Sequence, residues 1–216
     1  MPKKKFHRYI TEMKKFFNDD EAAASMLDEL HRKIEALPDI PAPKQELLIP
    51  EQIKDKDFHF ALYSDGACRG NPGSGSWAAI GQNHLGEMIF ESNGLEILTT
   101  NNRMELEGAI VSLKKVQNHL LSLSVNSKAS HVHVFLFSDS KYVIEGITKW
   151  VVGWKQNGWK KSDKKEPENL DQWKILDQIK NEFSHLTFEW VKGHAGHPQN
   201  ERCDELCNIA LDEAGY

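Results

Sequence analysis

From residue 59 onward, the order of local sequence patterns limits the fold more than any other feature of the chain. Three runs rich in β-forming residues come first, and short turns separate them. Helical and strand patterns then follow in the order αβααβα. This order is typical of a mixed sheet with helices on its faces. The patterns predict strands at 59–64, 76–82, 87–97, 131–137 and 186–191, and helices at 101–118, 141–150, 169–183 and 201–214.

The first fifty residues follow a different pattern. Apolar residues recur with helical spacing over 6–17 and again over 20–37. A stretch with four prolines comes next, at Pro38, Pro41, Pro43 and Pro50. We therefore predict a helical extension with a proline-rich linker at 1–56, in which the helices form a hairpin, and a larger domain at 57–216.

Composition excludes several classes of protein. The chain has 216 residues, of which 39% are hydrophobic, and none of its apolar runs reaches the roughly 20 residues that span a bilayer. The basic N-terminus is not followed by a secretory hydrophobic core. Three cysteines are too few for a disulfide framework and suit a reducing compartment. We expect a cytoplasmic monomer without a membrane partner.

Positive charge is concentrated in one segment of an otherwise acidic chain. The formal net charge is -5, yet residues 149–165 contain six lysines and one acid, Asp163. Three tryptophans are interleaved with these lysines, at Trp150, Trp154 and Trp159. Aromatic rings can stack on bases or sugars, and lysines can bind phosphates. The segment is a candidate nucleic-acid patch, although the tryptophans could instead be core residues and the lysines a solvated face.

Four acids are candidates for a metal site. Asp65 and Asp139 follow predicted strands, Glu105 lies early in a predicted helix, and Asp204 lies in the first turn of the last helix. Clustered carboxylates repel one another unless a cation neutralises them, and oxygen ligands favour Mg²⁺ or Mn²⁺. Two such ions can support phosphodiester hydrolysis. Taken singly, each acid could equally be a turn, dipole-complementing or solvated residue.

The sequence around these acids occurs in four segments that together form a specific pattern. The segments are 63–73 (YSDGACRGNPG), 99–106 (TTNNRMEL), 137–143 (FSDSKYV) and 190–206 (WVKGHAGHPQNERCDEL). In this order they resemble the motifs of type 1 ribonuclease H, from about residue 59 to the C-terminus. The resemblance implies a ribonuclease H-like α/β fold and hydrolysis of the RNA strand of RNA–DNA hybrids, with two metal ions and 5′-phosphate and 3′-hydroxyl products.

The resemblance also implies roles for individual residues. Asp65, Glu105, Asp139 and Asp204 match the metal-binding acids, and His194 matches a histidine that assists proton transfer or product release. The segment that contains Lys155, Lys160 and Lys161 with the three tryptophans matches a basic protrusion that holds the DNA strand. The remaining residues expected to contact the hybrid are Gly66, Cys68, Asn71, Thr100, Asn101 and Asn102. The asparagines could also simply cap a turn and a helix.

Three rival functions remain open at this point. Cys203, Cys207, His194 and His197 could form a zinc site, since the cysteines are spaced i, i+4 on a helix. The domain could bind hybrids without cutting them, or it could be another nuclease of the same broad fold.

The N-terminal extension has its own pair of hypotheses, because the resemblance does not cover it. Residues 1–50 could dock on the catalytic domain or on a protein partner through their apolar faces. Alternatively, their lysines and arginine could add affinity for nucleic acid.

Overall fold

The computed structural model describes residues 3–17, 20–36 and 48–216. Contacts between Cα atoms divide the chain into two compact units, Met1–Glu46 and Leu47–Tyr216. Most of the predicted proline-rich linker, including Pro38, Pro41 and Pro43, lies outside the described residues. The predicted domain boundary at residue 56 stays a prediction. Within the larger unit, however, Ile53 is fully buried and packs with Ala61 and Tyr63.

A five-stranded mixed sheet forms the centre of the larger unit, as the sequence predicts. Its strands lie in the order β3-β2-β1-β4-β5, with β1 paired antiparallel to β2 and parallel to β4. Strand β3 pairs antiparallel to β2, and β5 pairs parallel to β4. The strands are β1 (His59–Gly70), β2 (Gly73–Asn83), β3 (Met88–Thr99), β4 (His133–Ser138) and β5 (Leu186–Trp190).

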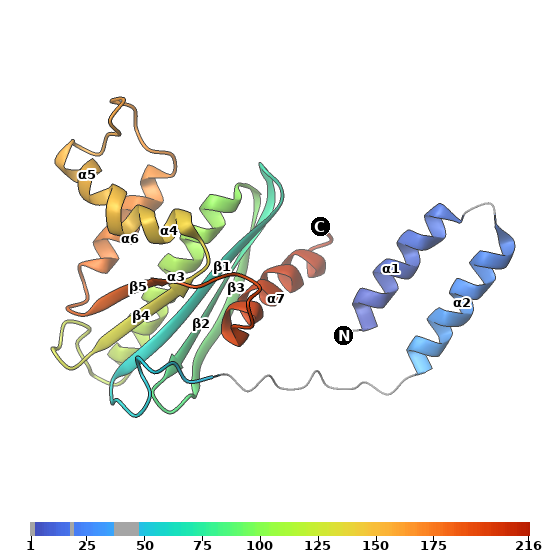
Figure 1. Ribbon diagram of the computed structural model, residues 1–216, viewed down its shortest axis with the longest axis horizontal. Coiled ribbons are helices and arrows are strands. Elements are labelled where there is room, and N and C mark those ends of the chain that lie inside the picture. Colours follow the sequence, from blue (N-terminus) through green and yellow to red (C-terminus); the bar gives the residue numbers. More distant parts are fainter. Residues whose placement is uncertain (1–2, 18–19, 37–47) are drawn as a thin grey trace. The chain divides into compact units, whose positions relative to one another are not determined.

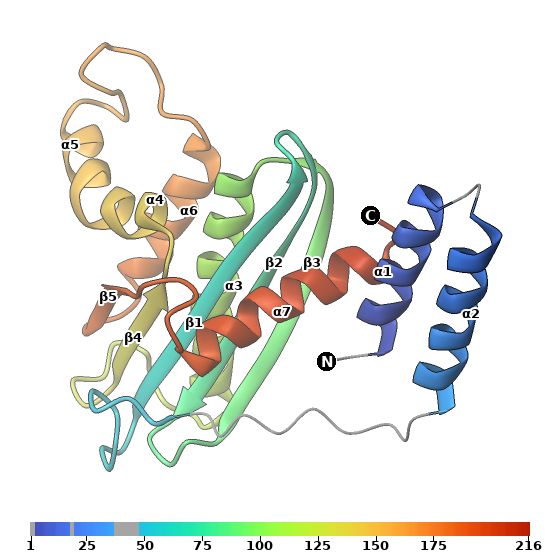
Figure 2. The ribbon, with the colours of Figure 1, turned by 45° about the vertical axis from the view of Figure 1, so that its right-hand side comes forward.

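Helices cover both faces of this sheet (Figures 1 and 2). On one face, α3 and α6 enclose a core that includes Leu62, Leu106 and Trp173. On the other face, α7 packs on β1 and β2 over a smaller core that includes Ile80 and Cys203. The helical segments of this unit are α3 (Asn101–Ser122), α4 (Lys141–Glu145), η1 (Gly146–Trp150), α5 (Val151–Gln156), α6 (Leu170–Lys180) and α7 (Pro198–Glu213).

The smaller unit is the predicted hairpin of two helices, α1 (Lys3–Phe16) and α2 (Glu21–Ala36). Its buried apolar residues are Ile10, Leu27 and Ile34. An ion pair of 2.5 Å between Lys14 and Asp28 also joins the two helices.

Several element bounds differ from the prediction by a few residues, among them the start of α7 at Pro198 instead of Glu201, and two differences are larger. Strand β1 continues to Gly70 rather than ending at Ser64, because residues 65–70 form a hairpin with β2. The helix predicted at 141–150 contains a π-helical turn, η1, and continues through α5 to Gln156. Gly146 begins this turn, where an added Cβ would lie 2.0 Å from the Trp173 ring. None of the helices in the described part of the chain is long and apolar enough to cross a membrane.

Candidate active site

Asp65 and Asp139 are brought together by the parallel pairing of β1 and β4. The last paired residues are Tyr63 and Phe137, so the register continued by two residues places Asp65 level with Asp139. Asp139 directly follows β4. Asp65 is inside β1, where the strand leaves β4 and continues alongside β2. The sheet register therefore brings the two acids together, although Asp65 is inside its strand and not at the strand end that the sequence predicted.

Glu105 reaches the same place from helix α3. The helix begins at the cap residue Thr100, whose hydroxyl accepts a hydrogen bond from the Arg103 backbone N–H at 3.4 Å. The helix lies very close to β1, because a Cβ at Gly66 would be only 2.2 Å from the Glu105 nitrogen. Glycine at position 66 therefore lets the start of α3 lie directly on the strand that carries Asp65.

The carboxylates of Asp65, Glu105 and Asp139 form the cluster that best fits a cation. Each offers an oxygen, and these oxygens all lie within 4.8 Å of one another. The Oε2 atom of Glu105 is buried and accepts no hydrogen bond from a described residue. A buried oxygen without a donor is otherwise unfavourable, so a cation fits this cluster well. The three acids thus support binding of a divalent metal ion.

Burial and mutual repulsion make this cluster electrostatically costly. Burial raises the pKa of Asp65 to about 7, and the Asp139 charge adds to this effect while the Gly66 N–H opposes it. Burial also raises the pKa of Glu105 well above its ordinary value, and the charges of Asp65 and Asp139 raise it further. A divalent cation would reverse this repulsion, because it favours the ionised carboxylates.

Asp204, the fourth predicted acid, is at the edge of the cluster rather than in it. It comes from the second turn of α7, and its Oδ1 accepts a hydrogen bond of 3.2 Å from Asn208. Its charge contributes to the raised pKa of Asp65, so it is close enough to act on the same site. Its assignment as a metal ligand stays a prediction.

Two residues that the sequence reasoning left without a role support Asp139 directly. The Asn200 amide donates a hydrogen bond of 3.1 Å to Asp139 Oδ2, and Asn200 is buried. The Trp190 indole N–H donates to the Asp139 backbone carbonyl at 3.0 Å. Asn200 precedes Asp204 by four residues on α7, so helical spacing could have indicated that both face one site.

His194 lies in the loop between β5 and α7. It is exposed and has a positive φ of 51°, and Gly193 beside it is so close that an added Cβ would be 2.5 Å from Asp139 Oδ2. The loop therefore passes next to the acid cluster. The catalytic role of His194 stays a prediction.

The geometry gives no support to the rival zinc site. Cys203 and Cys207 are buried, whereas His194 and His197 are exposed. Among the described residues, the only group of three or more potential ligands is the carboxylate cluster.

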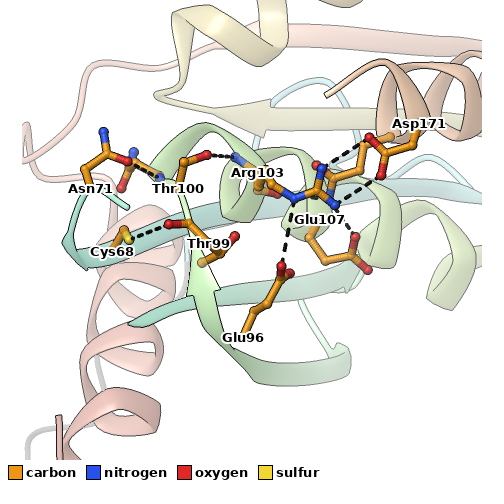
Figure 3. Close-up of polar contacts among 10 residues, drawn as sticks. Cys68, Asn71, Glu96, Thr99, Thr100, Arg103, Glu107 and Asp171 are labelled. Atoms are coloured by element: carbon orange, nitrogen blue, oxygen red, sulfur yellow. Dashed lines mark hydrogen bonds and ion pairs between the residues drawn. The ribbon is translucent and has the colours of Figure 1, made fainter. Parts of the chain in front are cut away.

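A polar edge lies beside the acids where α3 begins. Asn71 Oδ1 accepts a hydrogen bond of 3.3 Å from the Asn101 backbone N–H, and the Asn101 amide donates to Glu105 Oε1 at 3.1 Å. Figure 3 shows Asn71 and Thr100 close together at this edge, with Cys68 beneath them. The capping interpretation and the substrate-contact interpretation of these side chains are compatible, because Thr100 and Asn71 both remain accessible.

Arg103 anchors this edge to the rest of the fold. Its guanidinium donates to both carboxylate oxygens of Asp171 on α6, at 3.2 and 3.1 Å (Figure 3). Such a two-bond contact fixes orientation as well as distance. The start of α3, which carries Glu105 four residues after Asn101, is therefore held against α6.

The lysine-rich segment at residues 149–165, called the lysine segment here, begins at the end of η1 and includes α5. Trp150 and Trp154 are half-buried and pack in an aromatic cluster with Tyr142 and Trp173. Lys155 forms an ion pair of 2.7 Å with Asp177 on α6. Lys160 is exposed, and Lys161 lines a surface hollow with Trp150 and Trp154. The tryptophans therefore have a packing role, and their contact with nucleic acid stays a prediction.

Known proteins share this arrangement. The RNase H family model matches residues 57–212. A ribonuclease H from Rhizobium etli is 46% identical over 154 residues, covering 71% of this chain and 92% of that relative. A ribonuclease H from Klebsiella pneumoniae is 45% identical over 160 residues, covering 72% and 94%.

Solved structures agree with the sequence comparisons. The crystal structure of LC11-RNase H1 in complex with an RNA/DNA hybrid has a TM-score of 0.54 and 26% identity, covering 72% of this chain and 98% of that one. LC9-RNase H1, described as a type 1 RNase H, has a TM-score of 0.59 and 30% identity, covering 72% of both chains.

Proposed function

Because the chain belongs to the ribonuclease H family, we propose that it is an endonuclease that hydrolyses the RNA strand of RNA–DNA hybrids. The observation that carries this proposal is the convergence of Asp65, Glu105 and Asp139, whose oxygens lie within 4.8 Å of one another. A module that only binds hybrids has no need for this unfavourable cluster. The three free cysteines also support a reducing compartment, which we take to be the cytoplasm.

We assign the metal ligands to Asp65, Glu105, Asp139 and Asp204, with two Mg²⁺ ions as the preferred occupants. When bound, such ions supply an activated water and stabilise the charge on the departing 3′-oxygen. Asp65 and Asp139 contribute adjacent carboxylates from two strands, and the Asn200 hydrogen bond fixes the rotamer of Asp139. The products are a 5′-phosphate and a 3′-hydroxyl end.

His194 is suited to handle a proton at the edge of this site. The exposed loop that carries His194 passes next to Asp139, which supports a role for this imidazole in proton transfer. Its proposed task is to carry a proton to or from the departing oxygen and the solvent.

Recognition of the hybrid is proposed to use the polar edge and the lysine segment together. Backbone groups at Gly66 and Cys68, with Asn101 and Asn102, face the minor groove of the RNA strand, where 2′-hydroxyls distinguish RNA from DNA. Asn71 and Thr100 hold a phosphate of the DNA strand. The lysine segment also binds that strand, through Lys155, Lys160, Lys161 and the exposed parts of Trp150, Trp154 and Trp159.

The decisive experiment compares cleavage of a labelled RNA–DNA hybrid with single-stranded RNA, duplex RNA and duplex DNA in Mg²⁺. Wild type should cut only the hybrid. Asp65→Asn should retain hybrid binding in a gel-shift assay but lose cleavage. Asp55→Asn is the matched control, because Asp55 is an exposed carboxylate with φ of 56° and no place in the cluster.

Two outcomes would reject the proposal. If wild type binds the hybrid but cuts nothing in Mg²⁺ or Mn²⁺, the chain is a binding module. If the products end in a 2′,3′-cyclic phosphate, the RNA hydroxyl itself attacks and water is not the nucleophile.

A further inference from the structure

The N-terminal hairpin has too small a core to account for a stable unit. Among its described residues, three apolar side chains are buried, those of Ile10, Leu27 and Ile34. A unit of 46 residues is close to the size of about 40 below which a disulfide, a metal or a partner subunit is usually needed. Residues 1–46 contain no cysteine, and the described part of the hairpin contains no group of potential metal ligands. A partner subunit would supply the missing apolar contact.

Large apolar side chains nevertheless lie on the surface of this hairpin. They have helical spacing on α1 and α2, so they form a stripe on each helix. We call this set the apolar face, and its exposed fractions are 39% for Phe6, 45% for Met13, 88% for Phe16, 74% for Met26 and 47% for Leu30.

The two stripes lie on the same side of the hairpin. Met13 is three residues after the inward-facing Ile10, and Leu30 is three residues after the inward-facing Leu27. Three residues turn a helix by about 300°, so each side chain is about 60° from its inward neighbour. Because the helices run in opposite directions (Figures 1 and 2), equal rotations bring both side chains to one side. The apolar face is therefore continuous across the two helices.

Charge on the two helices is complementary. Between residues 3 and 16 there are six basic residues and one acidic residue, whereas residues 21–36 contain four acidic and two basic residues. An anionic membrane or nucleic acid would attract the first helix but repel the second. A second copy of the hairpin complements the charges of both helices, since α1 of one copy can lie over α2 of the other.

We propose that the apolar face is a dimerisation surface, at which two copies of this chain form a four-helix bundle. The contact is two-fold symmetric, so the same face serves both copies. Helices of 14 and 16 residues are about 21 and 24 Å long, which suits a short bundle of four antiparallel helices. This arrangement differs from the monomer that the sequence led us to expect.

Dimerisation would give the enzyme two catalytic units on one assembly. This consequence rests on the proposed function. When one unit releases a long hybrid, the other would keep the assembly attached, so the apparent affinity would rise with hybrid length.

The test is the molar mass of the full chain, measured by sedimentation velocity without nucleic acid. Wild type should sediment at twice the chain mass of 24.7 kDa. A variant with Phe16→Glu and Met26→Glu should sediment at the single mass, because it buries charge at the two most exposed positions of the apolar face. Leu121→Glu is the control, since Leu121 is 64% exposed at the end of α3 and should leave the dimer intact.

Circular dichroism must show that the Phe16→Glu, Met26→Glu variant keeps its helix content. The proposal is overturned if wild type sediments as a monomer at about 100 µM, far above the dissociation constant of a typical specific dimer. It is also overturned if the charged variant remains a dimer. Binding of monomeric wild type to vesicles of anionic lipid would assign the apolar face to membranes instead. Because none of these readouts uses cleavage, failure here is separate from failure of the proposed activity.

Discussion

At the scale of single residues, Asp65 combines burial with charge unfavourably. Its pKa of about 7 in the folded chain lies above the ordinary value of 3.8. The folded state therefore binds the proton more tightly than the unfolded chain does. The stability that this group contributes is complete below pH 3.8 and is lost as the pH rises through about 7.

Asp65→Asn should accordingly stabilise the metal-free protein. We expect the free energy of unfolding to rise by roughly 2–4 kcal/mol at pH 8 in EDTA, and by less at pH 5. Urea denaturation at the two pH values measures this difference. Asp55→Asn should change the free energy by less than about 0.5 kcal/mol at either pH. If Asp65→Asn is no more stable than wild type at pH 8, burial does not destabilise the ionised carboxylate.

Asn200 offers a second prediction at this scale, because it acts on Asp139 rather than on the substrate. Asn200→Ala should lower kcat by about 10- to 100-fold while KM for the hybrid stays the same. Raising the Mg²⁺ concentration should restore part of the loss. Asn181→Ala is the control, since Asn181 donates only to a backbone carbonyl of its own helix. A rise in KM at constant kcat would instead indicate direct contact with the hybrid.

The sequence was informative about the acids and less so about their supports. Asp65, Glu105 and Asp139 were all predicted, because the sequence segments around them resemble the motifs of the family. Asn200 lies within the last motif segment, but its role could not be predicted, since an asparagine can serve many local purposes. The peripheral position of Asp204 also could not be predicted, because it depends on how α7 crosses the sheet.

At the scale of elements, the close approach of α3 to β1 determines the geometry of the site. Gly66→Ala would place a methyl group 2.2 Å from the Glu105 nitrogen, so helix and strand must separate. We expect the free energy of unfolding to fall by about 1–3 kcal/mol and cleavage to be largely lost. Gly153→Ala is the matched control, because the same methyl group on α5 has no atom within 4 Å. Because alanine has the higher helix propensity, Gly153→Ala should leave the free energy of unfolding unchanged or raise it by up to about 1 kcal/mol. Equal effects of the two variants would contradict the packing argument.

The element order was predictable because alternation and helical spacing are strong over most segments. The element boundaries were less predictable where strand pairing overrides the local preference of the residues. Residues 65–70 contain Asp and two glycines, which are poor strand formers, yet β2 pairs with them to the end. The π-helical turn at Gly146 has no distinct pattern of its own, since it depends on the Trp173 ring across the core.

At the scale of the whole molecule, two ends of the sheet respond to pH in opposite directions. At the end away from the acids, the rings of His59, His133 and His185 stack, with centroids 4.4 and 4.3 Å apart. Burial lowers the pKa of His133, and the other two imidazoles add to this effect. Stability is therefore lost at this end as the pH falls below about 6.5, where the unfolded chain takes up the proton. The acid cluster loses stability as the pH rises from 3.8 through about 7, so the two ends oppose each other where these ranges overlap, between pH 3.8 and 6.5.

Metal binding should remove the loss of stability at high pH but leave the loss at low pH unchanged. Cations and protons compete for the carboxylates, so Mg²⁺ should raise the melting temperature at pH 8 but not at pH 5. Magnesium at about ten times its dissociation constant adds about 1.4 kcal/mol, which corresponds to roughly 3–6 °C for a domain of this size. Thermal denaturation in Mg²⁺ and in EDTA measures the shift, and the Asp65→Asn, Asp139→Asn double variant should show none. A shift in melting temperature of equal size at pH 8 and pH 5 would mean that Mg²⁺ binds elsewhere, because binding at the acid cluster must compete with protonation of its carboxylates. A shift in the double variant would lead to the same conclusion.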